Sequence, residues 1–299
     1  MESWESFAQA AQVLPKEFRT CALGLPRREQ GRAEELRLRV GRPMALVEPE
    51  GEQELDSPPV TEKTLEQLLE YATESSLHTA LPQLRQGFLT VPGGHRLGLC
   101  GRVALREGQP VNLRPLSSAA LRIARQVKGA ADGLLPELCE NGVLCSTLIL
   151  APPGQGKTTL LRDVIRSVSE GEGCFPLRVS LADERGEVAA VWNGRPQLDV
   201  GRRTDVLEGC SKGAALTILL RSMNPQVLAV DEITAREDGE ALAAAVGCGV
   251  ILLATAHGRD RTDLLRRPLY RGLLEDGLFQ RLVTIRREGQ RRNCCVEVL

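Results

Sequence analysis

Hydrophobic and polar positions follow two different patterns along this chain, and the change between them falls near its middle. The chain opens with apolar residues at three- and four-residue steps, which are Trp4, Phe7, Ala8, Ala11 and Leu14. This spacing predicts one face of a helix, which Pro15 should end. A second helix is predicted at 65–72 from the same kind of spacing. Between them, 34–47 has the pattern of short strands, and the acidic, proline-containing segment 48–59 is expected to be a loop.

Short alternating apolar runs separated by glycines fill 87–125, which predicts an antiparallel sheet. We therefore expect residues 1–135 to form a small N-terminal α+β domain. After a connector at 129–142, buried-type strands alternate with helical segments, which is typical of an α/β domain with a mainly parallel sheet, here assigned to 136–299. Its strands are expected at 144–150, 177–182, 227–230 and 250–254, and a last hairpin at 282–286 and 294–298.

The strongest chemical signal lies between the first of these strands and the helical segment after it. It reads Ala151-Pro152-Pro153-Gly154-Gln155-Gly156-Lys157-Thr158-Thr159. This is close to the P-loop pattern G-x-x-x-x-G-K-[ST], in which small residues let backbone N–H groups surround phosphate oxygens at a helix N-terminus. We expect 153–159 to hold ATP, with Lys157 at the β- and γ-phosphates and Thr158 on Mg²⁺. Ala151 replaces the first glycine of the pattern, at a strand end that does not require a positive φ.

Two of the predicted strands end in pairs of acidic residues, Asp183-Glu184 and Asp231-Glu232. The carboxyl ends of parallel strands meet at one edge of a sheet, where ligands bind in open α/β folds. We expect Asp231 to hold Mg²⁺ through water and Glu232 to activate the attacking water as a general base. A direct catalytic role is also expected for Asp183 and Glu184, with a salt-bridged strand end as the alternative.

A fourth cluster follows the strand at 250–254, where the chain reads Thr255-Ala256-His257-Gly258. Thr255 or His257 could sense the γ-phosphate by hydrogen bonding, whereas a lone histidine at a strand end is more often structural. Only five of the 38 basic residues are lysines, so lysine chemistry has few candidates.

The amino-acid composition reduces the number of functions that the sequence allows. Lys and Arg number 38 against 39 Asp and Glu, so the net charge of −1 excludes a globally basic nucleic-acid coat. Aromatic residues are 3%, which leaves few stacking platforms for single strands. The nine cysteines are scattered without zinc-site spacing and no spanning or secretory segment is visible, which indicates a reducing, cytoplasmic setting. The segment 259–292 holds ten arginines against five acids, which keeps a nucleic-acid-dependent ATPase open as an alternative.

The order of the P-loop, the two acidic strand ends and the Thr/His cluster resembles the secretion-ATPase branch of RecA-like P-loop proteins, the hexameric motors of type II and type IV secretion. The similarity is closer still to the stage III sporulation AA family of endospore-forming bacteria, from about residue 34 onward. Gln155 stands where that family usually has cysteine, and Gly186 where it usually has serine. The matching stretches lie at 35–43, 92–98, 121–125, 152–163, 183–185, 203–207, 221–223, 231–233, 237–238 and 255–258.

The resemblance implies a Mg²⁺-dependent ATPase motor of a secretion-like channel complex that links mother cell and forespore. It implies a homo-oligomer, a hexamer by analogy, that docks on membrane-protein partners at the inner face of the mother-cell membrane without stable nucleic acid. It assigns phosphate and Mg²⁺ binding to Lys157 and Thr158, and catalysis to Glu232 and His257. Arginines from the N-terminal domain or a neighbouring subunit are expected to assist, with Arg102, Arg122 and Arg203 as candidates. A nucleotide-gated scaffold with little turnover is the remaining alternative.

Overall fold

The computed structural model describes residues 3–73, 87–106, 109–288 and 291–299. By its internal packing, the chain divides into two compact units. Unit 1 is Met1–Gln126 with Ala190–Gln197, and unit 2 is Val127–Ala189 with Leu198–Leu299. The sequence predicts a domain boundary after residue 135, whereas unit 1 ends at Gln126 and also includes eight residues from the second half of the chain, Ala190–Gln197.

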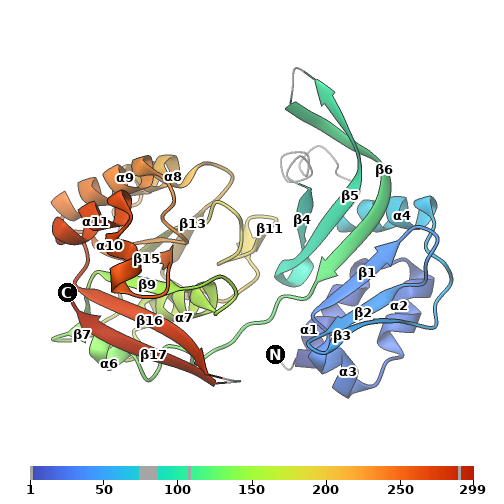
Figure 1. Ribbon diagram of the computed structural model, residues 1–299, viewed down its shortest axis with the longest axis horizontal. Helices are drawn as coiled ribbons and strands as arrows, with labels where there is room; N and C mark the ends of the chain where they lie inside the picture. Colours follow the sequence, from blue (N-terminus) through green and yellow to red (C-terminus); the bar gives the residue numbers. More distant parts are fainter. Residues whose placement is uncertain (1–2, 74–86, 107–108, 289–290) are drawn as a thin grey trace. The chain divides into compact units, whose positions relative to one another are not determined.

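Unit 1 is built on a six-stranded sheet in the order β3-β2-β1-β6-β5-β4, in which all neighbouring strands are antiparallel (Figure 1). The strands are β1 Glu35–Arg39, β2 Ala45–Glu48, β3 Gly51–Glu54, β4 Phe88–Val91, β5 His95–Arg106 and β6 Gln109–Arg122. The expectation of a loop at 48–59 was wrong for β3. This strand is exposed along its whole length and pairs only through its backbone with β2, so it has no apolar alternation by which sequence could reveal it.

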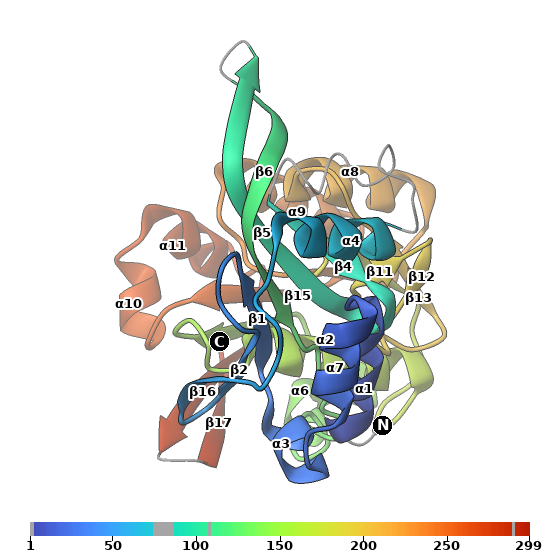
Figure 2. The same cartoon turned by 90° about the vertical axis from the view of Figure 1, so that its right-hand side faces the viewer.

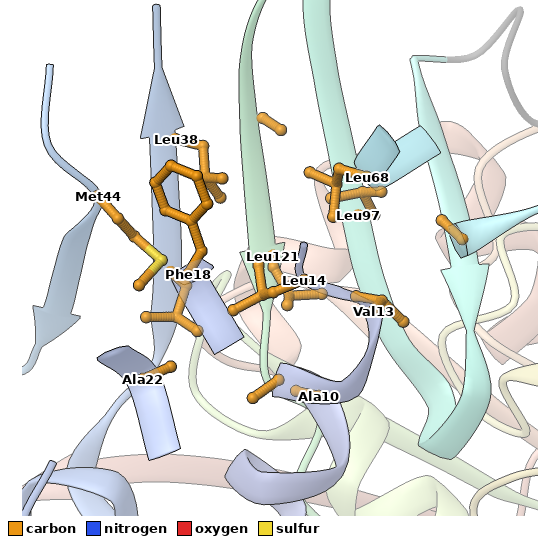
Figure 3. Packing of buried hydrophobic residues seen from close by; sticks show 14 of the residues in the cluster. Ala10, Val13, Leu14, Phe18, Ala22, Leu38, Met44, Leu68, Leu97 and Leu121 are labelled. Atoms are coloured by element: carbon orange, nitrogen blue, oxygen red, sulfur yellow. The ribbon is translucent and has the colours of Figure 1, made fainter. Parts of the chain in front are cut away.

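Helices cover this sheet and enclose the core of unit 1 (Figure 3). They are α1 Ser3–Ala10, η1 Ala11–Val13, α2 Lys16–Leu23, α3 Arg27–Arg32, α4 Glu62–Ala72 and η2 Pro92–Gly94. Phe7 of α1, Leu14 just after η1, and Leu38, Leu97 and Leu121 of the strands are fully buried. Burial of each such side chain stabilises the fold by about 1.5–3 kcal/mol. The predicted first helix is confirmed as α1 and η1, and the predicted second helix as α4.

A short hairpin, β11 Val191–Trp192 and β12 Arg195–Pro196, is the part of unit 1 that comes from the second half of the sequence (Figure 2). The backbone N–H of Gly93 in η2 donates to Gln197 Oε1 at 2.9 Å. Gly93 has a φ of +84°, a conformation that glycine adopts at little cost. The hairpin is therefore attached to the loop that leads into β5.

His95, at the start of β5, is fully buried. Its Nδ1 accepts a hydrogen bond from the Ala124 N–H at 3.0 Å, whereas Nε2 has no hydrogen-bond partner. Burial lowers the pKa of His95 from 6.5 to about 4, because the interior disfavours the charged imidazolium. The folded state therefore binds fewer protons than the unfolded chain between these two pH values.

We expect the contribution of His95 to stability to be complete above pH 6.5 and to be lost as the pH falls toward 4. The loss relative to neutral pH amounts to about 2 kcal/mol at pH 5. Denaturant unfolding from pH 7.5 to 5 checks this in the wild type and in His95→Asn, whose amide oxygen retains an acceptor and does not titrate. The variant should be less stable at pH 7.5 but show a flatter pH dependence. Parallel curves would show that His95 does not carry the effect.

Unit 2 contains a seven-stranded sheet in the order β13-β10-β14-β15-β9-β16-β17. Every neighbouring pair is parallel except the final hairpin of β16 and β17. These strands are β9 Thr147–Ala151, β10 Val179–Ala182, β13 Thr204–Leu207, β14 Val227–Val230, β15 Ile251–His257, β16 Arg281–Glu288 and β17 Arg291–Val298. The predicted α/β class, its four buried strands and its closing hairpin are confirmed.

Helices lie on both faces of this sheet (Figure 1). They are α6 Leu135–Leu138, α7 Lys157–Glu170, α8 Lys212–Ser222, α9 Arg236–Gly247, α10 Arg261–Leu265 and α11 Pro268–Glu275, and a small hairpin pairs β7 Cys139–Glu140 with β8 Val143–Leu144. One apolar cluster joins α8, α9 and α11 to Leu148, Leu228 and Leu252 of the central strands. Within the described ranges, no helix has the length and apolar character that crossing a membrane requires.

Candidate functional site

The parallel register of unit 2 brings the sequence-predicted clusters to one edge of the sheet. Ala151 at the end of β9 pairs with His257 at the end of β15, and Val230 at the end of β14 pairs with Ala254 of β15. On its other side, Val230 pairs with Ala182 of β10. The residues that follow these strands therefore lie next to one another, as expected for the carboxyl edge of a parallel sheet.

The candidate P-loop, residues 151–159, joins β9 to α7. Gly154 and Gly156 have φ values of +73° and +98°, so glycine is required where the loop reverses. Ala151 is the last residue of β9, which explains why alanine is accepted at the first position of the pattern. The N–H groups in the first turn of α7 have no acceptor within the helix and form the positive end of its dipole. The loop thus offers the donors that phosphate oxygens need.

Lys157 is only 7% exposed, and its ammonium is held in place at the base of the loop. Nζ donates to the carbonyl oxygens of Ala151 at 3.1 Å and Pro152 at 3.3 Å. It also lies 2.7 Å from His257 Nδ1, which must accept because an ammonium only donates. Burial lowers the pKa of Lys157, and the charges of Glu232 and Asp231 partly oppose this effect.

His257 links this lysine to the acidic strand end. Because Nδ1 accepts from Lys157, the ring proton of the neutral imidazole lies on Nε2, which is 3.0 Å from Glu232 Oε2. The backbone oxygen of His257 accepts from Arg267 Nη1 at 2.6 Å, which fixes the end of β15. The structure therefore connects Lys157, His257 and Glu232 in a continuous hydrogen-bonded chain.

Asp231 is held by two hydroxyl groups. Its Oδ2 accepts from Thr158 Oγ1 at 3.1 Å and its Oδ1 from Thr255 Oγ1 at 3.0 Å. Burial raises the pKa of Asp231, and these two hydrogen bonds lower it in part. Adjacent hydroxyl and carboxylate oxygens at the foot of a phosphate-binding loop fit Mg²⁺, which prefers oxygen ligands and completes its shell with water and phosphate. No cluster of three or more His, Cys, Asp or Glu in the described part of the chain forms a protein-only metal site.

Glu232 adopts a strained backbone conformation with a φ of +55°. For a residue with a Cβ, this region costs about 1–2 kcal/mol. Both sides of the residue are hydrogen-bonded: its N–H donates to Thr255 Oγ1 at 2.9 Å, and its carbonyl accepts from Lys212 Nζ at 2.9 Å. The next carbonyl, that of Ile233, accepts from the Tyr270 hydroxyl at 2.5 Å. The surroundings thus hold a conformation that the local sequence disfavours.

The other acidic strand end has a different arrangement. Asp183 is 1% exposed, and its carboxylate accepts from the backbone N–H groups of Glu187, Val188 and Ala189 at 2.8–3.3 Å. Burial raises its pKa, and these hydrogen bonds oppose the effect. Arg162 of α7 donates to the carbonyls of Val188 and Glu187 at 2.5 and 2.7 Å. Asp183 therefore organises its own loop. Its predicted role in catalysis stays a prediction, as does that of Glu184.

Of the candidate arginines, Arg203 belongs to the same unit as the P-loop but lies away from it, and Arg102 and Arg122 belong to unit 1. Arg203 donates through Nη1 to the carbonyl of Ser169 at 2.7 Å, and Ser169 lies about 18 Å farther along α7 than Lys157. In unit 1, Arg122 pairs with Glu35 at 3.2 Å and Arg102 is exposed on β5. Their action in a neighbouring subunit stays a prediction.

Two buried basic residues of this region were missed by the sequence analysis, Arg162 and Lys212. Arg162 lies in the helix that the P-loop predicts, but nothing in the pattern says that it points toward the loop after Asp183. Lys212 is one of five lysines, and together with Lys157 it is one of the two that are buried within the described residues. Lysine scarcity was the only available signal for it.

Comparison with solved structures supports the fold of the chain. The structure entitled "Crystal Structure of the Pilus Retraction Motor PilT and Bound ADP" superposes with a TM-score of 0.62 at 21% identity, covering 89% of this chain and 79% of that one. The ATPase DotB of Legionella pneumophila gives a TM-score of 0.58 at 15% identity, covering 89% of this chain and 76% of that one. The chain therefore has the RecA-like α/β fold of these two solved structures.

Comparison of sequences identifies the family to which the chain belongs. Stage III sporulation protein AA of Bacillus subtilis is 39% identical over 280 residues, which span 93% of this chain and 91% of that protein. A weaker match, 28% identical over 170 residues, is to the uncharacterized protein ycf45 of Porphyra purpurea, covering 56% of this chain and 28% of that protein. The profile described as "Sporulation stage III, protein AA" matches residues 7–295. The chain therefore belongs to the stage III sporulation protein AA family.

Proposed function

We propose that this chain is a Mg²⁺-dependent ATPase and the oligomeric motor of a secretion-like channel complex in endospore formation. The observation that carries the proposal is the hydrogen-bonded chain from Lys157 through His257 to Glu232, beside the Thr158–Asp231 pair. Phosphate-binding, metal-binding and general-base chemistry are thus adjacent at one sheet edge. A protein that only bound nucleotide would have no use for Glu232 in this place.

The P-loop would bind the phosphates of ATP through the N–H groups of 153–159. Lys157 has a lowered pKa and already lies at the base of the loop, so its ammonium would turn from the Ala151 and Pro152 carbonyls toward the β- and γ-phosphates. Thr158 and Asp231 would hold Mg²⁺, which when bound supplies positive charge to the phosphate oxygens. In turning, Lys157 would break its hydrogen bond to His257 Nδ1. Because His257 also contacts Glu232, phosphate binding at Lys157 would thereby affect Glu232.

Glu232 would then act as the general base for hydrolysis. In the present arrangement, its Oε2 accepts from His257 Nε2, and its backbone is fixed on both sides. A fixed carboxylate can hold a water molecule in line with the γ-phosphate and accept its proton. The charge that develops on the γ-phosphate calls for an arginine, and we assign that role to a neighbouring subunit or to unit 1, with Arg203, Arg102 and Arg122 as candidates.

The assembly that we propose is a homo-oligomer, a hexamer by analogy with secretion motors. Family membership and the fold likeness to a pilus retraction motor support it. We place it in the mother-cell cytoplasm, at the inner face of the membrane next to the forespore, where membrane-protein partners would receive its motion. Nucleic acid has no stable place in this proposal.

Turnover of MgATP by the purified chain should rise in specific activity with protein concentration, because the arginine is expected from a neighbouring subunit. Phosphate release measured across a concentration series, beside sedimentation of the same samples, tests this. DNA or RNA should leave the rate unchanged. Strong, salt-sensitive stimulation by either would favour a nucleic-acid-dependent ATPase. Bound ATP with negligible turnover at every concentration, also after membrane-protein partners are added, would favour a nucleotide-gated scaffold.

A further inference from the structure

We propose that Lys212 is a positioning residue for Glu232, holding its peptide in the strained conformation that points the carboxylate at His257. The inference rests on the proposed function, since it gives Lys212 a purpose only if Glu232 acts on ATP. It concerns a residue that no P-loop pattern includes. Lys212 begins α8, on the segment between β13 and β14, and so comes from a different part of the chain than the residues it would serve.

Lys212 occupies a position that is energetically unfavourable for a positive charge. Its side chain is buried, with the residue only 7% exposed, and burying an ammonium is costly unless partners replace its water. It is also the first residue of a helix, where the dipole disfavours a positive charge. Its partners are the Glu232 carbonyl at 2.9 Å and Glu184 Oε2 at 3.4 Å. A buried cation in such a place needs an explanation beyond packing.

Glu232, which Lys212 contacts, has an energetically unfavourable backbone conformation. Glu232 has a φ of +55°, and only its surroundings can hold it there. Thr255 Oγ1 accepts from the N–H of Glu232, and Lys212 donates to its carbonyl. The two hydrogen bonds fix the residue from both of its peptide groups. The buried Lys212 ammonium and the strained Glu232 backbone therefore stabilise each other through their hydrogen bond, and Glu232 is the proposed general base.

The charges around Lys212 support the same role. A cavity of about 20 Å³, room for a single water molecule, is lined by five acidic residues that include Asp231 and Glu232. Two cations also line it, the buried Lys212 and the exposed Arg185. Glu184 Oε2 lies 3.4 Å from the Lys212 ammonium, which itself donates to the Glu232 carbonyl at 2.9 Å. Glu184 thus supplies a compensating negative charge beside the buried Lys212.

Lys212→Met tests the proposal, because methionine matches the aliphatic part of the lysine side chain and lacks the donor. We expect kcat to fall about 10–100-fold, as for other small misplacements of a catalytic group, with the Kd of a fluorescent ATP analogue and KM within about threefold of wild type. Hydrogen exchange without nucleotide should increase at residues 231–235. Lys212→Arg retains a cationic donor, so both kcat and the exchange rate at 231–235 should return close to the wild-type values. Lys128→Met, at an exposed lysine paired with Asp199, is the matched control and should change neither.

Wild-type kcat and wild-type exchange at 231–235 in Lys212→Met would overturn the inference, as would failure of Lys212→Arg to restore either. If Lys212→Met does not fold, Lys212→Gln supplies an uncharged donor, and the same exchange measurement decides. The proposed function is tested separately by Glu232→Gln. Loss of turnover there with normal turnover in Lys212→Met refutes only the role of Lys212, whereas normal turnover in Glu232→Gln refutes the proposed base and this role together.

Discussion

Replacing Glu232 by glutamine should lower ATP turnover by about 10²–10⁴-fold, the range that a positioned general base contributes. The amide keeps the size of the side chain and an oxygen that can accept from His257 Nε2, which lies 3.0 Å from the carboxylate. It cannot accept a proton from water. ATP binding should stay within about threefold of wild type, since phosphate contacts belong to the P-loop and not to this carboxylate.

Phosphate release under saturating MgATP, beside the Kd of a fluorescent ATP analogue, measures both quantities. Glu240→Gln is the matched control, because Glu240 is an exposed glutamate of α9 whose partner is Arg236. It should leave turnover and binding unchanged. A Glu232→Gln protein that hydrolyses ATP at the wild-type rate would remove the general base from the proposed mechanism.

Replacing Lys157 by alanine should weaken ATP binding by about 100-fold, the upper part of the range for a lost hydrogen bond to a charged group. Lys157 is buried, and the carbonyls of Ala151 and Pro152 already hold its ammonium within the loop before ATP binds. No solvent-exposed cation can replace the lost ammonium, because Lys157 is buried inside the loop. Turnover should be lost with binding.

Titration of the fluorescent analogue with the Lys157→Ala protein gives the change in Kd directly. Lys128→Ala removes a positive charge from an exposed lysine and should bind as wild type does, which controls for net charge. Equal affinity of wild type and Lys157→Ala would show that 151–159 is a structural turn. The two variants also separate their roles, since Glu232→Gln should bind ATP without turnover and Lys157→Ala should do neither.

The sequence by itself determined the fold class and predicted which residues would meet at the carboxyl edge of the sheet. The P-loop spacing between an apolar strand and a helix identified Lys157 and Thr158, and apolar runs ending in acids identified Asp231 and Glu232. The strands could be predicted because a buried parallel strand needs a continuous apolar run, and the carboxyl ends of parallel strands meet at the edge where ligands bind. The edge strand β3 was missed because backbone pairing alone holds it.

Only the tertiary structure decided how these residues are held. Two of its features depend on contacts between segments separated in sequence: residues 190–197 pack with unit 1, and Lys212 contacts the Glu232 carbonyl. The left-handed φ of Glu232 is likewise invisible in the sequence, since a glutamate there would ordinarily avoid it. Periodicity and motif spacing report local backbone needs, whereas contacts between distant segments arise only when the chain has packed, and those contacts fix the geometry of the site.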